Sequence, residues 1–269
     1  MSSTAPRGPL VDTHSHLVLL EERGLLEAAL ESAAAAEVEQ MVTVGLNVED
    51  SDRNRLLAEA HDNVWFTVGW HPHQPHAPDP AQLGALDELL AHPRAVAVGE
   101  IGIDLYFRPG YHDTPLQEQQ RALHVMLDLA ASRGKPVVVH DRDAHSLVLE
   151  ALLLHPEVRG VMHCFSGDAA FARRCVAAGY VISFSGIITF AHSEAQQEAA
   201  RAAGSAEYVV ETDSPFLAPV PHRGRPNLPG YVAATAAALA ALRSEDEGQV
   251  RAQSTATARR LFGLPGLRR

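Results

Sequence analysis

A chain of 269 residues that is 46% hydrophobic and 20% charged can bury a large core, which excludes a largely disordered protein. Its 22 basic and 33 acidic residues give a formal net charge of −11, which excludes a protein that coats nucleic acid through a broad basic surface. Only two cysteines, Cys164 and Cys175, are present, so neither a disulfide framework nor a thiolate zinc site is expected. No stretch approaches the roughly 20 apolar residues that cross a bilayer, and we predict a cytoplasmic protein without a membrane partner.

Short apolar runs alternate along the chain with longer stretches that have helical spacing. The runs predict strands at residues 10–12, 41–45, 64–68, 95–99, 136–139, 160–162, 180–184 and 208–210. The helical spacing predicts helices at residues 23–39, 52–61, 81–91, 116–132, 144–154, 168–178, 194–203, 231–243 and 247–262. The alternation therefore predicts an α/β protein with a parallel sheet that is covered by helices.

Eight such strand and helix units in about 250 residues are typical of a (β/α)8 TIM barrel, with a doubly wound open sheet as the alternative. No linker rich in proline, glycine or serine divides the sequence. We therefore predict one domain over residues 10–269, preceded by a flexible tail at residues 1–9. The long connections at residues 106–115 and 215–229 are candidate binding loops.

Six histidine and carboxylate side chains stand where predicted strands end. His14 and His16 lie two residues apart after the first run, so on a strand they point to the same face. The later runs are followed by Glu100, His140, His163 and Asp213. The carboxyl ends of barrel strands meet at one face, so these six residues are expected to converge there. Imidazole favours zinc-like ions and carboxylate tolerates Mg²⁺ or Mn²⁺, so we predict a site for one or two divalent cations.

Several motifs together resemble the TatD family of metal-dependent deoxyribonucleases. They are residues 12–17 (DTHSHL), 69–73 (GWHPH), 99–104 (GEIGID), 140–142 (HDR), 163–167 (HCFSG) and 211–219 (ETDSPFLAP). The resemblance runs from about Val11 to Phe262 and implies a TIM-barrel hydrolase of nucleic-acid phosphodiesters, often a 3′-to-5′ exonuclease. The family's metal ligands fall on the same six residues. The chain departs from the family pattern at Ile103, where Leu is frequent, and at Leu228, where Glu is frequent.

Hydrolysis of a phosphodiester requires metal ligands of the kind predicted here. The site must produce hydroxide at neutral pH and neutralise charge on the phosphate oxygens, and two divalent ions about 3.5–4 Å apart do both. We expect Glu100 to bridge the ions and Asp213 to accept a proton from the attacking water. The other ligands divide into two sets, with His14, His16 and Asp213 on one ion and His140 and His163 on the other.

Two histidines after the third predicted strand carry a weaker signal. We expect His73 to act in catalysis, by contacting the scissile phosphate or protonating the leaving oxygen, and His71 to bind substrate. The alternative is that both cap a tight turn shaped by Pro72. Asp104, which follows the fourth strand, is expected to orient a ligand or a loop without binding metal itself.

Three further side chains are candidate contacts for the substrate. Arg142 and Arg223 are predicted phosphate ligands, because guanidinium matches phosphate oxygens in a bidentate manner and the acidic chain needs a local grip on a polyanion. Tyr106 is expected to stack on a base at a strand terminus. The alternatives are ordinary surface arginines and an aromatic loop anchor.

Three functions fit these residues. The first is a hydrolase of nucleic-acid phosphodiesters, acting on single-stranded DNA, with RNA as a second candidate substrate. The second is a metal-dependent ester hydrolase such as a D-aminoacyl-tRNA deacylase, and the third is a barrel that binds metal or nucleic acid without catalysis. The only lysine, Lys135, precedes the fifth predicted strand, which disfavours an amide-ring hydrolase that bridges its metals with a carboxylated lysine. The absence of an apolar stripe fits a monomer.

Overall fold

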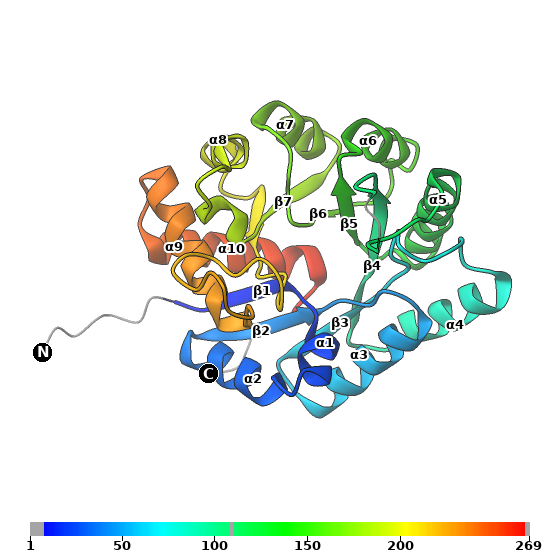
Figure 1. Cartoon of the computed structure of the whole chain (residues 1–269), viewed down its shortest axis with the longest axis horizontal. Helices are drawn as coiled ribbons and strands as arrows, with labels where there is room; N and C mark the ends of the chain where they lie inside the picture. Colours follow the sequence, from blue (N-terminus) through cyan, green and yellow to red (C-terminus); the bar gives the residue numbers. More distant parts are fainter. Residues whose placement is uncertain (1–7, 108–109, 267–269) are drawn as a thin grey trace, which may run out of the picture.

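The structure is a computed structural model that describes residues 8–107 and 110–266. Its eight strands form one parallel sheet in the order β1 to β8. Ser15 at the end of β1 pairs with Ser214, which follows β8, and the Asp213 amide donates to the His14 carbonyl. The first and last strands therefore meet and close the sheet into a (β/α)8 barrel, and the open doubly wound sheet is excluded. Figure 1 shows the ring of strands with helices outside it.

The strands follow the predicted runs closely. They are β1 (Leu10–Ser15), β2 (Val38–Thr43), β3 (Val64–Val68), β4 (Ala95–Asp104), β5 (Val137–Arg142), β6 (Gly160–Met162), β7 (Tyr180–Phe184) and β8 (Tyr208–Val210). Both β4 and β5 extend beyond their predicted ends, so Glu100 and His140 lie within strands instead of after them. The register of this pair shifts between Val98 and Ile101, just where Glu100 stands.

Ten α-helices are described, and most of them cover the outside of the barrel. They are α1 (Leu17–Glu22), α2 (Leu26–Ala35), α3 (Val48–Ala60), α4 (Pro80–Leu90), α5 (Leu116–Arg133), α6 (His145–Leu153), α7 (Ala169–Ala177), α8 (Glu194–Ala202), α9 (Val232–Arg243) and α10 (Glu247–Phe262). Two short 3₁₀ helices, η1 (Gly186–Thr189) and η2 (Pro229–Tyr231), lie in the connections around β8. In the part of the chain that the structure describes, every helix is too short or too polar to cross a bilayer.

Alternate residues of each strand pack into two separate cores. On β5, for example, Val137 and Val139 belong to the core shared with the helices, whereas Val138 belongs to a second core. This second core is made of strand valines and of the end of α10, including Phe262. Side chains of a strand alternate between its two faces, so the second core fills the inside of the barrel and α10 closes its lower end.

The prediction of one helix over residues 23–39 was wrong. The helix α2 ends at Ala35, Glu37 takes a left-handed backbone conformation with φ of 59°, and β2 begins at Val38. The polar pair Glu39 and Gln40 looks helical in the sequence, but Gln40 is fully buried in the strand. Its amide donates to the Pro265 carbonyl, so a residue distant in the sequence makes the buried polar side chain acceptable.

The predicted domain boundaries remain a prediction, because most of the expected tail at residues 1–9 lies outside the described residues. The fold determines where the carboxyl ends of the strands lie. Strands β1 to β8 all point the same way, so the residues at their carboxyl ends gather on one face of the barrel, which we call the upper face.

Candidate metal centre

Three of the predicted ligands meet where β1 and β8 adjoin. His14 lies in β1 and His16 directly after it, and their Nε2 atoms are 3.4 Å apart. The Asp213 carboxylate follows β8 and places Oδ1 3.2 Å from Nε2 of His16 and 3.8 Å from Nε2 of His14. These three residues form a group whose potential ligand atoms all lie within 4.8 Å of one another. The pairing of the strands, and not only the spacing in the sequence, creates this half of the site.

Glu100 occupies the middle of the cluster. Its carboxylate lies 3.5 Å from Nε2 of His14, 2.6 Å from Nδ1 of His140 and 3.5 Å from Nε2 of His163. Nε2 of His71 is 3.6 Å away, so His71 lies beside the ligands and forms a second compact group with Glu100 and His140. One carboxylate therefore faces imidazoles from four different segments of the chain.

The histidines of the cluster differ in their protonation. Burial lowers the pKa of His14 to about 3 and that of His71 to about 4, so both imidazoles are neutral with a free lone pair at pH 7. Burial opposes protonation of His140 as well, but hydrogen bonds to Asp104 and Glu100 raise its pKa to about 9. At His163, the neighbouring Glu211 and Glu100 carboxylates overcome burial and raise the pKa to about 10. The buried carboxylates of Glu100, Asp104 and Glu211 thus favour positive charge at the centre of the site.

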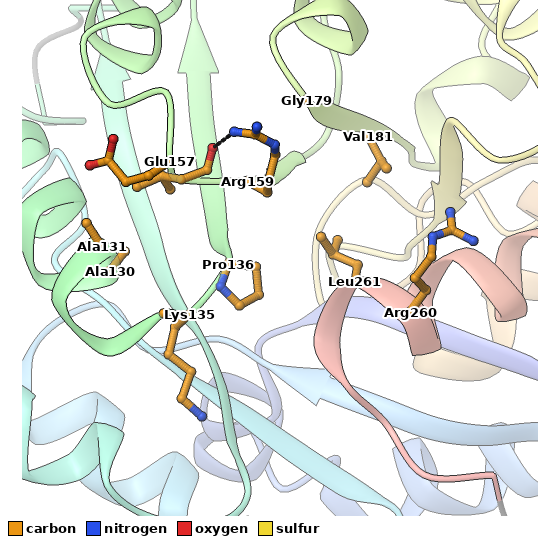
Figure 2. A pocket seen from close by; sticks show the side chains of 12 residues that line it. Ala130, Ala131, Lys135, Pro136, Glu157, Arg159, Gly179, Val181, Arg260 and Leu261 are labelled. Carbon is orange, nitrogen blue, oxygen red and sulfur yellow. Dashed lines mark hydrogen bonds between the residues drawn. The ribbon is translucent and has the colours of Figure 1, made fainter.

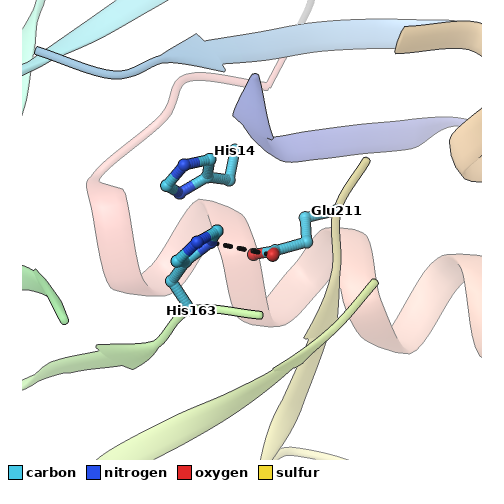
Figure 3. A group of neighbouring side chains, drawn as sticks. All are labelled: His14, His163 and Glu211. Carbon is cyan, nitrogen blue, oxygen red and sulfur yellow. Dashed lines mark ion pairs between the residues drawn. The ribbon is translucent and has the colours of Figure 1, made fainter. Parts of the chain in front are cut away.

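Glu211 is a site residue that directly follows the last predicted strand and that the sequence analysis assigned no role. Its Oε1 lies 2.8 Å from Nδ1 of His163 and accepts a hydrogen bond of 2.8 Å from the Cys164 amide. Figure 3 shows the carboxylate of Glu211 beside the His163 ring, with the His14 ring stacked above at a centroid distance of 3.5 Å. A carboxylate on one nitrogen of a histidine fixes the ring so that the other nitrogen faces a metal. The position of Glu211 at the end of β8 was a usable signal in the sequence.

The donor set fits a divalent cation. Nδ1 of His14 and Nδ1 of His16 are buried and have no hydrogen-bond partner among the described residues, while both Nε2 atoms face the carboxylates. Among the described residues no arginine or lysine pairs with Glu100 or Asp213, so the two carboxylates and the Nε2 atoms of the two imidazoles converge as a cation site requires. Nitrogen and oxygen donors in this mixture suit zinc-like ions as well as manganese.

His73 and Asp104 stand next to this centre. His73 Nε2 hydrogen-bonds Oδ2 of Asp104 at 2.9 Å, and the same oxygen lies 3.3 Å from Nε2 of His140. Burial disfavours the Asp104 carboxylate, but hydrogen bonds from His140 and His73 hold its pKa below the usual range, so it is ionised. Asp104 therefore connects a predicted ligand to a predicted catalytic histidine.

The predicted substrate contacts lie in different settings. The Arg142 guanidinium is 4.0 Å from the Tyr106 ring and donates to the Tyr111 hydroxyl at 2.9 Å, next to Asp104. The Arg223 guanidinium instead packs 4.0 Å from the Phe190 ring and donates to the Ala218 carbonyl. The structure thus brings Arg142 and Tyr106 together beside the centre and gives Arg223 an anchoring role in its own loop.

The loop after β8 is held by the residue next to the unusual Leu228. The Asn227 side chain donates to the carbonyls of Thr212 and Phe216, and its amide donates to the Pro215 carbonyl. Leu228 packs against the core that the strands share with the helices, which explains an apolar side chain at this position. The departure from the family pattern therefore leaves the loop that carries Asp213 in place.

A closed parallel barrel with imidazoles and carboxylates gathered at the carboxyl ends of its strands is the architecture of the metal-dependent hydrolases. A family model described as TatD related DNase matches residues 11–263. A protein of Mycobacterium tuberculosis named "uncharacterized metal-dependent hydrolase TatD" is 38% identical over 96% of this chain and all of its own length. This chain belongs to the TatD family of metal-dependent hydrolases.

Other relatives point the same way. A Klebsiella pneumoniae protein named "3'-5' ssDNA/RNA exonuclease TatD" is 34% identical, over 86% of this chain and 89% of its own. The crystal structure of the TatD homologue YJJV from Escherichia coli superposes with a TM-score of 0.89 at 30% identity, over 97% of this chain and all of that one. An organophosphorus hydrolase from Deinococcus radiodurans, at 12% identity and a TM-score of 0.63 over 94% of this chain and 93% of its own, shares the fold alone.

Proposed function

We propose that this enzyme hydrolyses phosphodiester bonds of nucleic acids as a 3′-to-5′ exonuclease, with single-stranded DNA as its main substrate. The observation that carries the proposal is the convergence of six imidazole and carboxylate donors at the upper face of the barrel. The names of the exonuclease relatives support the choice of substrate. Unstacked ends suit a narrow site, since a single strand needs no melting before it enters.

The six donors would hold one or two divalent ions, with Mg²⁺, Mn²⁺ and Zn²⁺ as the candidates. Glu100 lies between the two halves of the cluster and is our choice for a bridging ligand. The set of His14, His16 and Asp213 would form one half, and His140 and His163 the other. When bound, divalent cations at such a centre lower the pKa of water and neutralise charge on phosphate oxygens.

Asp213 is the residue that we assign to the proton of the attacking water. Its Oδ1 faces His16 and His14, so the second carboxylate oxygen is free to accept a proton from a water that approaches the phosphate. Glu100 contributes to catalysis by keeping negative charge at the centre, because it is buried yet has a pKa held well below the ordinary value by the surrounding histidines.

His73 is the residue that we assign to the scissile phosphate or the leaving oxygen. Asp104 holds the His73 ring through Nε2, which leaves the opposite ring nitrogen to make the contact with substrate. The His73 side chain is 23% exposed, so a substrate in the upper face can reach it. His71 lies 3.6 Å from Glu100, and we assign it to the orientation of the bound phosphate.

The substrate would be gripped by the residues next to β4 and β5. Arg142 lies over the Tyr106 ring and beside Tyr111, and we assign its guanidinium to a phosphate of the substrate and the Tyr106 ring to the terminal base. Arg223 is the weaker of the two predicted phosphate contacts, since its guanidinium already packs on Phe190. We further propose that the enzyme works as a monomer in the cytoplasm.

A substrate panel tests the proposal. Purified protein is incubated with labelled single-stranded DNA, single-stranded RNA, a D-aminoacyl-tRNA and a generic ester, each with Mg²⁺, Mn²⁺ or a chelator. We expect stepwise shortening of the DNA from its 3′ end, abolished by the chelator. Hydrolysis of the aminoacyl-tRNA without cleavage of DNA would replace the nuclease by a deacylase, and binding without turnover would indicate a non-catalytic barrel.

A Glu100→Ala variant tests the role of the metal centre. Loss of this central carboxylate is expected to lower metal content and to reduce turnover by about 10²–10³-fold or more, as when one electrostatic stabiliser of a transition state is removed. Glu59→Ala is the matched control, because Glu59 lies on the exposed surface of α3 and pairs with Arg55. Full metal loading and unchanged activity of the Glu100→Ala variant would contradict the assignment.

A further inference from the structure

A second group of potential ligands lies beside the metal centre and contains none of its six predicted ligands. Its members are His73, Asp104 and His112, whose ligand atoms all lie within 4.8 Å of one another. Nε2 of His73 is 2.9 Å from Oδ2 of Asp104, and Nε2 of His112 is 3.6 Å from Oδ1 of the same carboxylate. The two imidazole rings stack with centroids 4.2 Å apart. The three side chains come from the loop after β3, the end of β4 and the loop after β4.

The His112 ring packs against the rings of His73, Phe107 and Tyr111, but this packing does not involve hydrogen bonds to its nitrogens. Its side chain is only 2% exposed, yet neither ring nitrogen has a hydrogen-bond partner among the described residues. A buried imidazole with both nitrogens unsatisfied costs free energy, because it has given up its hydrogen bonds to water. Its Nε2 points to Asp104 but is too far away for a good hydrogen bond. The ring is therefore placed to bind something that stands between the two.

Asp104 has the complementary property. It is completely buried, and in the described part of the chain no arginine or lysine pairs with it. Its oxygens accept from the Tyr106 amide at 2.8 Å and from the Tyr111 hydroxyl at 3.2 Å. Oδ2 also faces His73 and His140, whereas Oδ1 accepts only from the Tyr106 amide among the described residues, so one of its two lone pairs remains for a cation.

We propose that His73, Asp104 and His112 form a separate binding site for a divalent transition-metal ion such as Zn²⁺. Two imidazole nitrogens and one carboxylate oxygen with an open fourth position are a typical zinc ligand set. Ligand atoms of a tetrahedral zinc ion lie about 3.3 Å apart, close to the distances of 2.9 and 3.6 Å found here, so small rotations of these three side chains are enough to enclose it. Mg²⁺ would be a poor occupant, because it prefers oxygen ligands and keeps its waters.

This site would regulate the neighbouring centre if His73 has the role proposed above, and this consequence rests on the proposed function. A metal ion on Nε2 of His73 displaces its hydrogen bond to Asp104, and Asp104 also contacts His140 of the main centre at 3.3 Å. Loading the second site is therefore expected to lower any turnover that depends on His73. The existence of the site itself does not depend on the reaction.

Metal content tests the proposal directly. The full chain is stripped with chelator, dialysed against Zn²⁺ and analysed for bound metal, beside a His112→Asn variant and a His124→Asn control. His124 is partly buried on α5, where its Nδ1 lies 3.2 Å from Nε2 of His155, and it is not a member of the proposed site. We expect the His112→Asn variant to bind one ion fewer per chain than the wild type and the His124→Asn control to bind the full number. Equal numbers in all three folded proteins would overturn the proposal.

The wild-type protein provides a test that does not depend on folding of a variant. Anomalous scattering at the zinc edge from a zinc-soaked crystal is expected to show a peak about 2.0–2.2 Å from the three donor atoms. A peak at the main centre without one here would overturn the inference. A peak here in a protein that fails to cleave any nucleic acid would leave the site in place and reject the proposed function, so the two outcomes are distinguishable.

Discussion

The two ends of the barrel use polar residues in opposite ways. The lower end holds a hollow of about 470 Å³ between the ends of α5 and α10, lined by Lys135, Arg159 and Arg260 among others (Figure 2). All three cations donate to backbone carbonyls, with Lys135 on Ala95, Arg159 on Val158 and Arg260 on Ala206. At the upper end the buried imidazoles of His14 and His16 each keep one nitrogen without a partner among the described residues.

This difference teaches that a hollow does not by itself mark the reactive end of a barrel. The polar groups of the lower end fasten strands and helices, so a ligand would have to displace contacts that already exist. The polar groups of the upper end are imidazoles and carboxylates that face one another across the carboxyl ends of the strands. Convergence of imidazoles and carboxylates, and not empty volume, therefore indicates where the chemistry occurs. The contrast predicts that substitutions at the lower end change stability and those at the upper end change metal binding and turnover.

The largest expected effect is on stability, at the closed lower end. A Phe262→Ala change removes a ring of α10 that is 4% exposed and packs in the inner core of the barrel. The free energy of unfolding is expected to fall by about 3–5 kcal/mol because of the cavity left behind. Denaturant unfolding measures this, while turnover of the folded variant stays at the wild-type level. A Leu154→Ala control, at a side chain that is 72% exposed, is expected to change stability by no more than about 0.5 kcal/mol.

A loss of turnover in the folded Phe262→Ala protein would contradict the separation of the two ends, because it would show that the core inside the barrel controls the geometry of the upper face. Metal analysis on the same sample separates the two cases. Full metal content together with normal turnover keeps the two ends independent.

A smaller effect is expected at the support of the metal centre. Glu211→Gln keeps the size of the side chain but removes the charge that faces His163, so metal affinity is expected to fall by about 10–100-fold. Competition with a metal indicator measures the dissociation constant. Glu150→Gln, on the exposed surface of α6, is the control with the same chemical change. An unchanged affinity in the Glu211→Gln variant would show that His163 needs no support and does not hold the ion.

The smallest effect compares one arginine from each end. Arg142→Ala is expected to weaken the interaction with single-stranded DNA about tenfold, or about 1.4 kcal/mol, because a phosphate contact beside Tyr106 is lost. Arg260→Ala, at an exposed residue of the lower end, is expected to leave DNA binding unchanged. Filter binding or the KM for a labelled oligonucleotide measures both. Weaker binding in the Arg260→Ala variant would place substrate at the lower hollow and reverse the comparison.

Much of the fold could be predicted from the local sequence because strand residues here are nearly continuous apolar runs. Each predicted run overlaps a strand, since β-branched residues fit a pleated surface that is buried on both faces. The failure at residues 23–39 arose where a polar residue, Gln40, is buried in a strand. Its partner is the carbonyl of Pro265, and such a distant hydrogen bond leaves no trace in the local pattern.

The candidate site divides in the same way. His14, Glu100 and Asp213 could be named because each follows an apolar run, and parallel strands must present their ends on one face. The position of Glu211 directly after β8 was a signal in the sequence, but its contact with His163 could not be predicted, because the two residues follow strands that are separated by β7. His112 lies in a loop without periodicity, so only the structure shows its ring against that of His73.

The sequence by itself determined the order of strands and helices and the residue types at the strand ends, since both are local properties of composition and spacing. The tertiary structure alone decided that the sheet closes, through the contacts of Ser15 with Ser214 and of His14 with Asp213. Closure brings the first and last strands together and surrounds Glu100 with imidazoles from distant segments. Coordination distances are set by this three-dimensional arrangement, because side chains far apart in the chain fix one another's positions only after the barrel has formed.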